Sequence, residues 1–195
     1  MQLLEERIQS EAMVVSPDVL RVDMFLNHQI DTTLLDAIGA EFARLFADEV
    51  GRVTKILTVE ASGIAVACAA ARYFSVPVVF AKKGSSNRTL DQQVYCAPIY
   101  SFTKETTSTV SVARRFLSAD DRVLVIDDFL ANGAAARGML SLLEQADATL
   151  AGIGIVIEKA FQPGGLALRA QGLRIASLAV ISSMEGGTVE FAHYD

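Results

Sequence analysis

The spacing of apolar residues along the chain predicts a sheet covered by helices. Short runs rich in valine and isoleucine are typical of buried strands, and apolar residues that recur at helical spacing are typical of helices packed on a sheet. The strand-like runs are 53–59, 76–81, 95–102, 107–112, 122–126, 150–157, 175–181 and 188–192. The helical runs are 2–12, 32–48, 64–74, 133–145 and a short run that ends at residue 171. Strand, helix and strand follow one another within about thirty residues, which predicts parallel strands joined by crossover helices.

Two segments depart from this pattern. Residues 14–30 match neither period, so we expect them, with the helix before them, to form a small N-terminal hood (residues 1–30) outside the sheet. Residues 82–106 combine a polar stretch with a strand-like run and predict a flexible lid hairpin. The chain of 195 residues contains no internal repeat, low-complexity tract or linker. We therefore predict one α/β domain over residues 1–195, with a central, mainly parallel sheet flanked by helices.

Composition argues against several classes of protein. The net charge of −6 disfavours broad nucleic-acid binding, and no apolar run approaches the length of a membrane span. The N-terminus is acidic and lacks the basic start and apolar run of a signal peptide. The two cysteines form neither a disulfide framework nor a zinc site, and Cys68 is expected to be a buried free thiol. The two histidines, His28 and His193, are not expected to bind a metal ion. These features predict a cytoplasmic protein.

Candidate chemistry begins with two adjacent carboxylates, Asp127 and Asp128, which stand where the strand at 122–126 should end. Carboxylates at the C-terminal end of a parallel strand face the crevice in which open α/β sheets bind ligands. The small residues 131–135 come next and start a helix, whose N-terminus and backbone N–H groups favour an anion. A phosphorylated sugar carries both the phosphate and the hydroxyl groups that suit this arrangement. The alternative is that the aspartates only cap the helix and lie in water.

Four stretches also resemble a known family. Asp-Asp-Phe-Leu-Ala-Asn-Gly at 127–133 is similar to the signature with which type I phosphoribosyltransferases bind phosphoribosyl pyrophosphate (PRPP). Glu-Ala-Ser-Gly at 60–63 resembles the family's pyrophosphate loop. Phe-Leu-Asn-His-Gln at 25–29 and Glu-Lys-Ala-Phe-Gln-Pro at 158–163 resemble segments that bind the purine. The resemblance therefore implies the type I phosphoribosyltransferase fold.

For PRPP, the resemblance implies three sets of contacts. Asp127 and Asp128, the catalytic pair, hold the ribose 2′ and 3′ hydroxyls, directly or through metal-bound water, and favour the positive charge that develops at the anomeric carbon. The 5′-phosphate loop comprises Ala131, Asn132, Gly133, Ala134 and Ala135, and the pyrophosphate loop comprises Glu60, Ala61, Ser62 and Gly63. Lys82 and Lys104 are the expected partners of the leaving pyrophosphate, with further charge from Lys83 and Arg88, unless these residues are only solvated. Mg²⁺ is expected to arrive with PRPP.

The chain departs from the family pattern at three alanines. Ala61 replaces a serine expected in close relatives. Ala134 and its neighbours replace a threonine or serine whose hydroxyl binds the phosphate, so backbone N–H groups and Asn132 must make most of that contact. Ala131 stands where some relatives place an acidic general base, which leaves proton removal from the purine unassigned.

For the purine, the resemblance implies contacts from Lys159, Leu20 and Asn27. An ammonium group has three donors and no acceptor, so Lys159 suits an exocyclic oxygen and favours a 6-oxopurine over adenine. Asn27 is able to donate to the additional oxygen of xanthine, and Phe161 to stack on the ring. The alternative is that Lys159 is a solvated charge at a strand end.

Together the resemblances imply a pentosyltransferase that converts xanthine and PRPP to xanthosine 5′-monophosphate and pyrophosphate, in purine salvage, as a homodimer. Hypoxanthine–guanine or adenine phosphoribosyltransferase activity is the enzymatic alternative. A PRPP-sensing transcription regulator of the same fold fits less well, because the chain is acidic and has no residues to spare for a DNA-binding domain. Neither nucleic acid nor a membrane is an expected partner.

Overall fold

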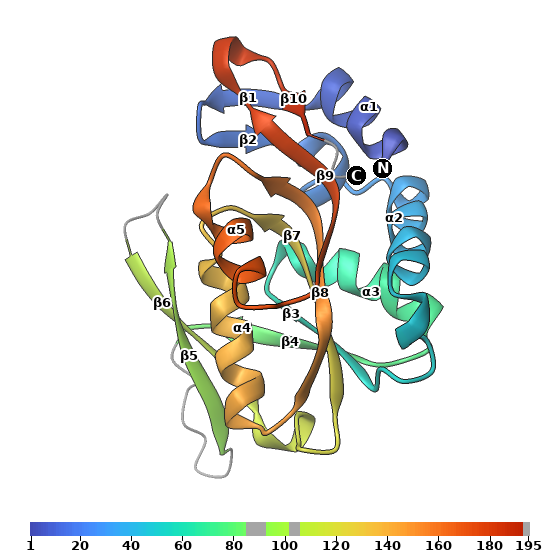
Figure 1. Ribbon diagram of the computed structural model, residues 1–195, viewed down its shortest axis with the longest axis vertical. Helices are drawn as coiled ribbons and strands as arrows, with labels where there is room; N and C mark the ends of the chain where they lie inside the picture. Colours follow the sequence, from blue (N-terminus) through green and yellow to red (C-terminus); the bar gives the residue numbers. More distant parts are fainter. Residues whose placement is uncertain (85–92, 102–105, 193–195) are drawn as a thin grey trace.

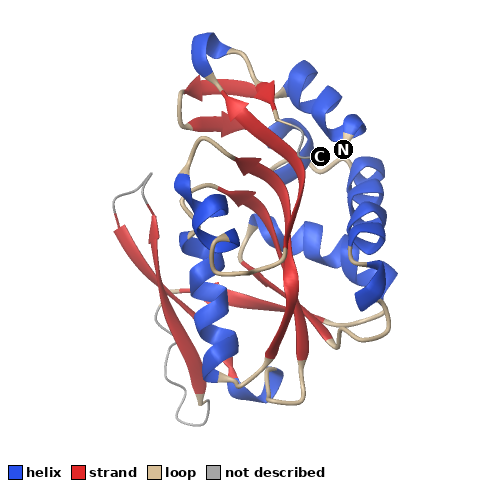
Figure 2. Ribbon diagram, in the orientation of Figure 1, coloured by secondary structure: helices blue, strands red, loops and turns tan. Residues whose placement is uncertain are grey.

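The computed structural model describes residues 1–84, 93–101 and 106–192. These residues form an eight-stranded main sheet in the order β10-β9-β8-β7-β3-β4-β6-β5, with helices on both faces (Figure 1, Figure 2). Its strands are β3 (Lys55–Val59), β4 (Val78–Lys83), β5 (Val94–Ser101), β6 (Thr106–Ala113), β7 (Arg122–Leu130), β8 (Thr149–Lys159), β9 (Ile175–Ser183) and β10 (Glu190–Phe191). The α-helices are α1 (Gln2–Glu11), α2 (Thr32–Leu45), α3 (Ser62–Phe74), α4 (Ala134–Gln145) and α5 (Pro163–Arg169). No helix among the described residues is long and apolar enough to cross a membrane.

The centre of the main sheet is parallel. β4 and β7 both pair parallel with β3, β8 pairs parallel with β7, and β9 with β8. Towards the edges, β6 pairs antiparallel with β4 and β5, and β10 pairs antiparallel with β9. The predicted α/β fold with a mainly parallel sheet is thus confirmed. The carboxyl ends of β8, β7, β3 and β4 consequently meet at one edge of the sheet.

Each face of the sheet is covered by helices. α2 and α3 pack on one face, where Phe42 of α2 shares a buried cluster with Leu124 of β7. α4 packs on the other face, where Met139 shares a second buried cluster with Val123 of β7. The adjacent residues 123 and 124 belong to different clusters because side chains alternate across a strand. This alternation gives the central strand two buried faces.

The hood lies outside the main sheet, as its sequence pattern predicts. β1 (Met13–Ser16) and β2 (Val19–Arg21) form a separate two-stranded antiparallel sheet, and the π-helix η1 (Asp23–Asn27) follows them. α2 then begins after Asp31, whose Oδ1 accepts a hydrogen bond from the backbone N–H of Thr33 at 2.9 Å. The predicted helix cap at Asp31 is therefore confirmed.

Two strands continue beyond their apolar runs. The apolar run predicts that Asp127 and Asp128 stand at the end of the strand. β7 instead continues to Leu130, so both aspartates lie within it. The neighbouring strand causes the extension, because Asp127 pairs with Ile155 of β8 and the ladder carries on to the end of β7. β8 likewise continues to Lys159, where it pairs with β9. Pairing partners, rather than local apolar content, set where these strands end.

Cys68 does not have the burial predicted for it. Cys68 is exposed, because it lies on the same outward side of α3 as the exposed Arg72, four residues later. The prediction of a buried thiol is therefore wrong. β5, which lies within the predicted lid, forms an antiparallel hairpin with β6, which continues beyond it. Residues 85–92 and 102–105, which include Arg88 and Lys104, lie outside the described residues, as does His193.

Candidate active site

Most of the predicted PRPP-binding residues, together with Lys159, lie at the carboxyl ends of four adjacent parallel strands. The loop 60–63 follows β3, Lys82 and Lys83 end β4, the loop 131–133 follows β7, and Lys159 ends β8 (Figure 1). Open α/β sheets bind ligands at such an edge. The fold thus brings together segments that are far apart in the sequence.

The two aspartates of the catalytic pair differ in their surroundings. Asp127 is 4% exposed, whereas Asp128 is half-buried. The backbone N–H of Asp128 donates to Asp127 Oδ1 at 3.0 Å. Burial raises the pKa of Asp127 well above its ordinary value, the nearby charge of Asp128 raises it further, and the charge of Lys83 opposes both. Asp128 is therefore the carboxylate that a ligand reaches first. Asp127, the weaker acid of the two, lies behind it.

The loop after β3 is held against the end of β4. Its peptide bond between Glu60 and Ala61 is cis. The backbone N–H of Glu60 donates to the carbonyl oxygen of Ala81 at 3.1 Å, and Glu60 Oε1 accepts from the backbone N–H of Lys83 at 2.5 Å. α3, 13 residues long, begins at Ser62. The loop therefore presents the positive end of a helix dipole to the site.

Gly63 brings this loop against the catalytic pair. A Cβ at Gly63 would lie 2.1 Å from Thr58 Oγ1 and 2.9 Å from Asp127 Oδ1, so a larger residue would displace one of them. Thr58 is fully buried, and its Oγ1 has no hydrogen-bond partner in the described part of the chain. Nothing in the sequence marks Thr58 as a site residue, because threonine is common in strands.

The loop after β7 combines a left-handed backbone position with a charged neighbour. Gly133 has a φ of 82°, a left-handed conformation that suits glycine. Asn132 Oδ1 accepts from the backbone N–H of Ala134 at 2.9 Å and so occupies the first amide of α4. The Nδ2 group of Asn132 remains as the side-chain donor for a phosphate. Arg137 Nη2 donates to the carbonyl oxygen of Asn132 at 2.9 Å, which adds a positive charge that was not predicted.

Lys159 turns from the end of β8 towards the hood. Its side chain is nearly buried, its Nζ donates to the carbonyl oxygen of Asp18 at 2.6 Å, and it lies 5.3 Å from the centroid of the Phe129 ring. Burial lowers the pKa of Lys159, and the charge of Asp18 opposes this shift. The interpretation as a solvated strand-end charge is therefore wrong. Gln162 also bonds Asp18, through Nε2 to Oδ1 at 3.3 Å, so Asp18 is a site neighbour that was not predicted.

The two other predicted purine contacts lie in the hood. Leu20 is a buried residue of β2, and Asn27 is exposed at the end of η1. The bond from Lys159 to Asp18 ties the end of β8 to the hairpin that carries Leu20. Phe161 is 39% exposed, which leaves its ring open to stacking. A purine that contacts Lys159 would therefore lie beside the hood.

The lysines that end β4 are both exposed. Lys82 Nζ lies 5.9 Å from the centroid of the Phe80 ring. The charge of Lys83 acts on Asp127, whose pKa it lowers. Of these two lysines, Lys83 is therefore the one electrostatically coupled to the catalytic pair. Lys104 cannot be compared with them, because it lies outside the described residues.

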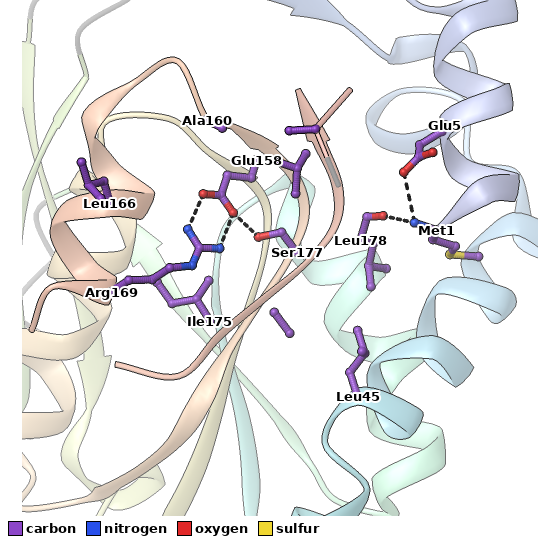
Figure 3. Close-up of a pocket in the computed structure, with 13 residues that line it drawn as sticks. Met1, Glu5, Leu45, Glu158, Ala160, Leu166, Arg169, Ile175, Ser177 and Leu178 are labelled. Carbon is purple, nitrogen blue, oxygen red and sulfur yellow. Dashed lines mark hydrogen bonds and ion pairs between the residues drawn. The ribbon is translucent and has the colours of Figure 1, made fainter. Parts of the chain in front are cut away.

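A cavity of about 680 Å³ lies elsewhere, along β9 (Figure 3). Its lining includes Met1 beside α1, Leu45 of α2, and the buried Glu158 with its partner Arg169. None of the residues predicted to bind PRPP or the purine lines it. This cavity is therefore separate from the predicted site.

Comparison with known proteins agrees with the architecture. The sequence profile of the family described as "Phosphoribosyl transferase domain" matches residues 29–164. Proteins named xanthine phosphoribosyltransferase from Bacillus cytotoxicus, Bacillus cereus and Bacillus mycoides are each 54% identical to the chain over 195 residues, covering 100% of it and 98% of each relative. Among solved structures, the adenine phosphoribosyltransferase of Rhodothermus marinus superimposes with a TM-score of 0.72 at 20% identity, covering 92% of this chain and 99% of that one.

A second structure, the Giardia lamblia enzyme in complex with 9-deazaadenine, superimposes with a TM-score of 0.74 at 20% identity, covering 91% of this chain and 96% of that one. At such identities these structures establish the fold alone. The sequence relatives and the family profile go further, because they match most or all of the chain. The protein has the type I phosphoribosyltransferase fold and belongs to the phosphoribosyltransferase family.

Proposed function

We propose that this protein transfers the 5-phosphoribosyl group of PRPP to xanthine, releasing pyrophosphate and forming xanthosine 5′-monophosphate in purine salvage. The observation that carries the proposal is the nearly buried ammonium group of Lys159, held between β7 and the hood at the edge that also carries the catalytic pair. An ammonium group donates and cannot accept, so it selects an oxo group over an amino group. The names of the relatives that are 54% identical support xanthine as the purine.

At the sugar end, backbone amides bind the 5′-phosphate and the catalytic pair binds the ribose. The N-terminus of α4, Asn132 and Arg137 offer donors and positive charge to the 5′-phosphate. The carboxylate of Asp128 accepts hydrogen bonds from ribose hydroxyls, with Asp127 behind it. Their negative charge stabilises the positive charge that grows at the anomeric carbon as the bond to pyrophosphate breaks.

At the leaving group, the loop 60–63 and the lysines of β4 receive the pyrophosphate. The start of α3 supplies amides, and Lys82 and Lys83 supply positive charge where negative charge accumulates. We propose that Mg²⁺ enters as part of the PRPP substrate, since Mg²⁺ bound to a diphosphate needs few protein ligands. Carboxylate oxygens are ligands that suit this ion, although the described residues hold no group of three or more potential metal ligands.

A purine panel tests the proposal. Pyrophosphate release from PRPP is measured separately with xanthine, guanine, hypoxanthine and adenine. The highest kcat/KM is expected with xanthine and the lowest with adenine, because Lys159 meets an oxygen only in the 6-oxopurines. A preference for adenine would contradict the role of Lys159, and the absence of turnover with every purine would contradict the reaction itself.

Asn132 provides a prediction about PRPP alone. Asn132→Asp keeps an oxygen for the first amide of α4 but removes the Nδ2 donor and adds a negative charge beside the phosphate. The KM for PRPP is expected to rise by roughly tenfold or more, since hydrogen bonds to charged groups contribute about 1.5–3 kcal/mol. Asn132→Ala also loses the bond to the amide and is expected to unfold at a lower temperature than Asn132→Asp. An unchanged KM in both variants would remove Asn132 from the phosphate site.

We also propose that the protein is a cytoplasmic homodimer. The family resemblance supports the dimer, and the two free, exposed cysteines fit a reducing compartment. Light scattering coupled to size-exclusion chromatography is expected to give twice the mass of the chain, which is 20.9 kDa. A monomer mass across the assay concentrations would reject the dimer.

A further inference from the structure

The side chains of the adjacent residues Glu158 and Lys159 lie on opposite sides of β8. Lys159 reaches the hood, whereas Glu158 turns to α5 because side chains alternate along a strand. The carboxylate of Glu158 is 1% exposed and accepts two bonds from Arg169, Nη1 to Oε1 at 2.5 Å and Nη2 to Oε2 at 2.7 Å (Figure 3). Ser177 Oγ donates to the same Oε2. A buried carboxylate requires such partners, so Glu158 holds Arg169 in one geometry.

Arg169 ends α5, and the first turn of α5 packs on the 5′-phosphate loop. The backbone N–H of Gly164 donates to the carbonyl oxygen of Ala131 at 3.0 Å. A Cβ at Gly164 would lie 2.3 Å from that oxygen and 2.5 Å from the backbone nitrogen of Gly133. A Cβ at Gly165 would lie 2.0 Å from Glu158 Oε1. α5 therefore fits without spare room between the ion pair and the loop.

We propose that Glu158 and Arg169 are positioning residues for PRPP. Their ion pair fixes α5, and α5 fixes the loop 131–133 at a set distance from Lys159, which is on the same strand as Glu158. Neither residue is proposed to touch the substrate. The inference rests on the proposed function, because it takes that loop as the site of the 5′-phosphate.

The chain contains a matched control at the other end of the sheet. Glu49 is 3% exposed, and Arg122, the first residue of β7, donates to it from Nε and Nη2, both at 2.6 Å. The exposed fractions of the arginine side chains are similar, 28% for Arg122 and 32% for Arg169. The two pairs thus match in burial and in the number of bonds between arginine and carboxylate, although Arg169 binds through Nη1 and Nη2 and Arg122 through Nε and Nη2. Only the pair of Glu158 and Arg169 adjoins the loop.

The test compares Arg169→Lys with Arg122→Lys in the full-length protein. Lysine keeps the charge but cannot make the two parallel bonds of arginine. Both substitutions are expected to lower the midpoint of thermal unfolding by similar amounts. Only Arg169→Lys is expected to raise the KM for PRPP, by roughly tenfold or more, because a displaced loop 131–133 loses hydrogen bonds to the charged 5′-phosphate, each of which contributes about 1.5–3 kcal/mol. The KM for xanthine and kcat are expected to stay within about twofold of the unsubstituted protein in both variants, since Lys159 and the catalytic pair remain in place.

A second variant approaches the loop from the other side. Gly164→Ala places a Cβ against the loop backbone, whereas Leu166→Ala changes a residue of α5 that is 77% exposed. Gly164→Ala is expected to raise the KM for PRPP and Leu166→Ala to leave it unchanged. If Arg169→Lys does not fold, Glu158→Gln against Glu49→Gln makes the same comparison.

The outcomes separate this inference from the proposed function. An unsubstituted protein that releases no pyrophosphate from PRPP contradicts the proposed function. An active protein in which Arg169→Lys and Arg122→Lys share one KM for PRPP contradicts the positioning role alone. Loss of folded protein with an unchanged KM in the folded remainder has the same meaning, because it shows a purely structural ion pair.

Discussion

Replacing Asp127 with asparagine is expected to lower kcat for phosphoribosyl transfer by about a hundredfold or more, the usual cost of removing one preorganised electrostatic contact to a transition state. Asparagine keeps an oxygen for the backbone N–H of Asp128 but cannot ionise, so it cannot supply negative charge as the positive charge develops on the sugar. Steady-state kinetics with PRPP and xanthine measure the effect. Full turnover in the variant would contradict the catalytic role.

The same substitution is expected to raise the midpoint of thermal unfolding at neutral pH. In the folded protein, burial and the charge of Asp128 hold the pKa of Asp127 well above the ordinary 3.8. Between these two pKa values the folded state holds a proton that the unfolded state has lost, so ionisation of Asp127 destabilises the fold as the pH rises through this window. Asparagine does not ionise. Its stabilising effect is therefore expected at neutral pH and should disappear below about pH 3.8, where both states are protonated.

Asp121, which directly precedes β7, is the matched control for Asp127. Burial alone would raise the pKa of Asp121, but its hydrogen bonds with Lys55, Ser118 and Thr54 together hold that pKa below the ordinary value. Its ionised form therefore stabilises the fold above the ordinary pKa, and this contribution is lost in acid. Asp121→Asn is expected to lower the unfolding midpoint at neutral pH and to leave kcat unchanged. Opposite effects of one chemical change at the two positions would separate catalysis from stability.

Replacing Lys159 with alanine is expected to lower kcat/KM for xanthine by about ten- to a hundredfold, because the exocyclic oxygen of the bound base would lose its donor and an unsatisfied buried acceptor costs about 1–3 kcal/mol. The constants for PRPP are expected to change little, because Lys159 lies beside the hood and not at the 5′-phosphate loop. The panel of four purines measures both the loss and the flattening of base preference.

Lys55→Ala is the control for Lys159→Ala. Lys55 is the first residue of β3 and pairs with Asp121 at 2.8 Å, at the opposite edge of the sheet. This variant is expected to lose stability but to retain the preference for xanthine. If Lys159→Ala retained it as well, the purine would have to be recognised by other residues.

Much of the fold follows from the sequence because apolar spacing carries it. The parallel neighbours β3 and β4, the helix between them and the cap at Asp31 all arise from local patterns that the structure confirms. The ends of β7 and β8 do not, because strand length there depends on hydrogen bonds to neighbouring strands. Cys68 shows the same limit in a helix, since an alanine-rich sequence conceals which side faces the solvent.

The candidate site divides in a similar way. The charged residues Asp127, Asp128 and Lys159 stand out because charges next to buried strands are uncommon. Thr58 adjoins Gly63 of the pyrophosphate loop and Asp18 accepts a bond from Lys159, but one resembles an ordinary strand residue and the other an ordinary turn residue. Their importance comes from contacts with residues distant in sequence, which no local pattern reveals.

The bond between Lys159 and the Asp18 carbonyl affects how the site discriminates between purines. The free protein already satisfies the ammonium group, so a 6-oxopurine exchanges one acceptor for another and gains little net free energy from that contact. A base with an amino group at the same position would displace the carbonyl without offering the ammonium group an acceptor in its place. Such an arrangement rejects wrong bases more effectively than it tightens the right one, and it separates selectivity from affinity.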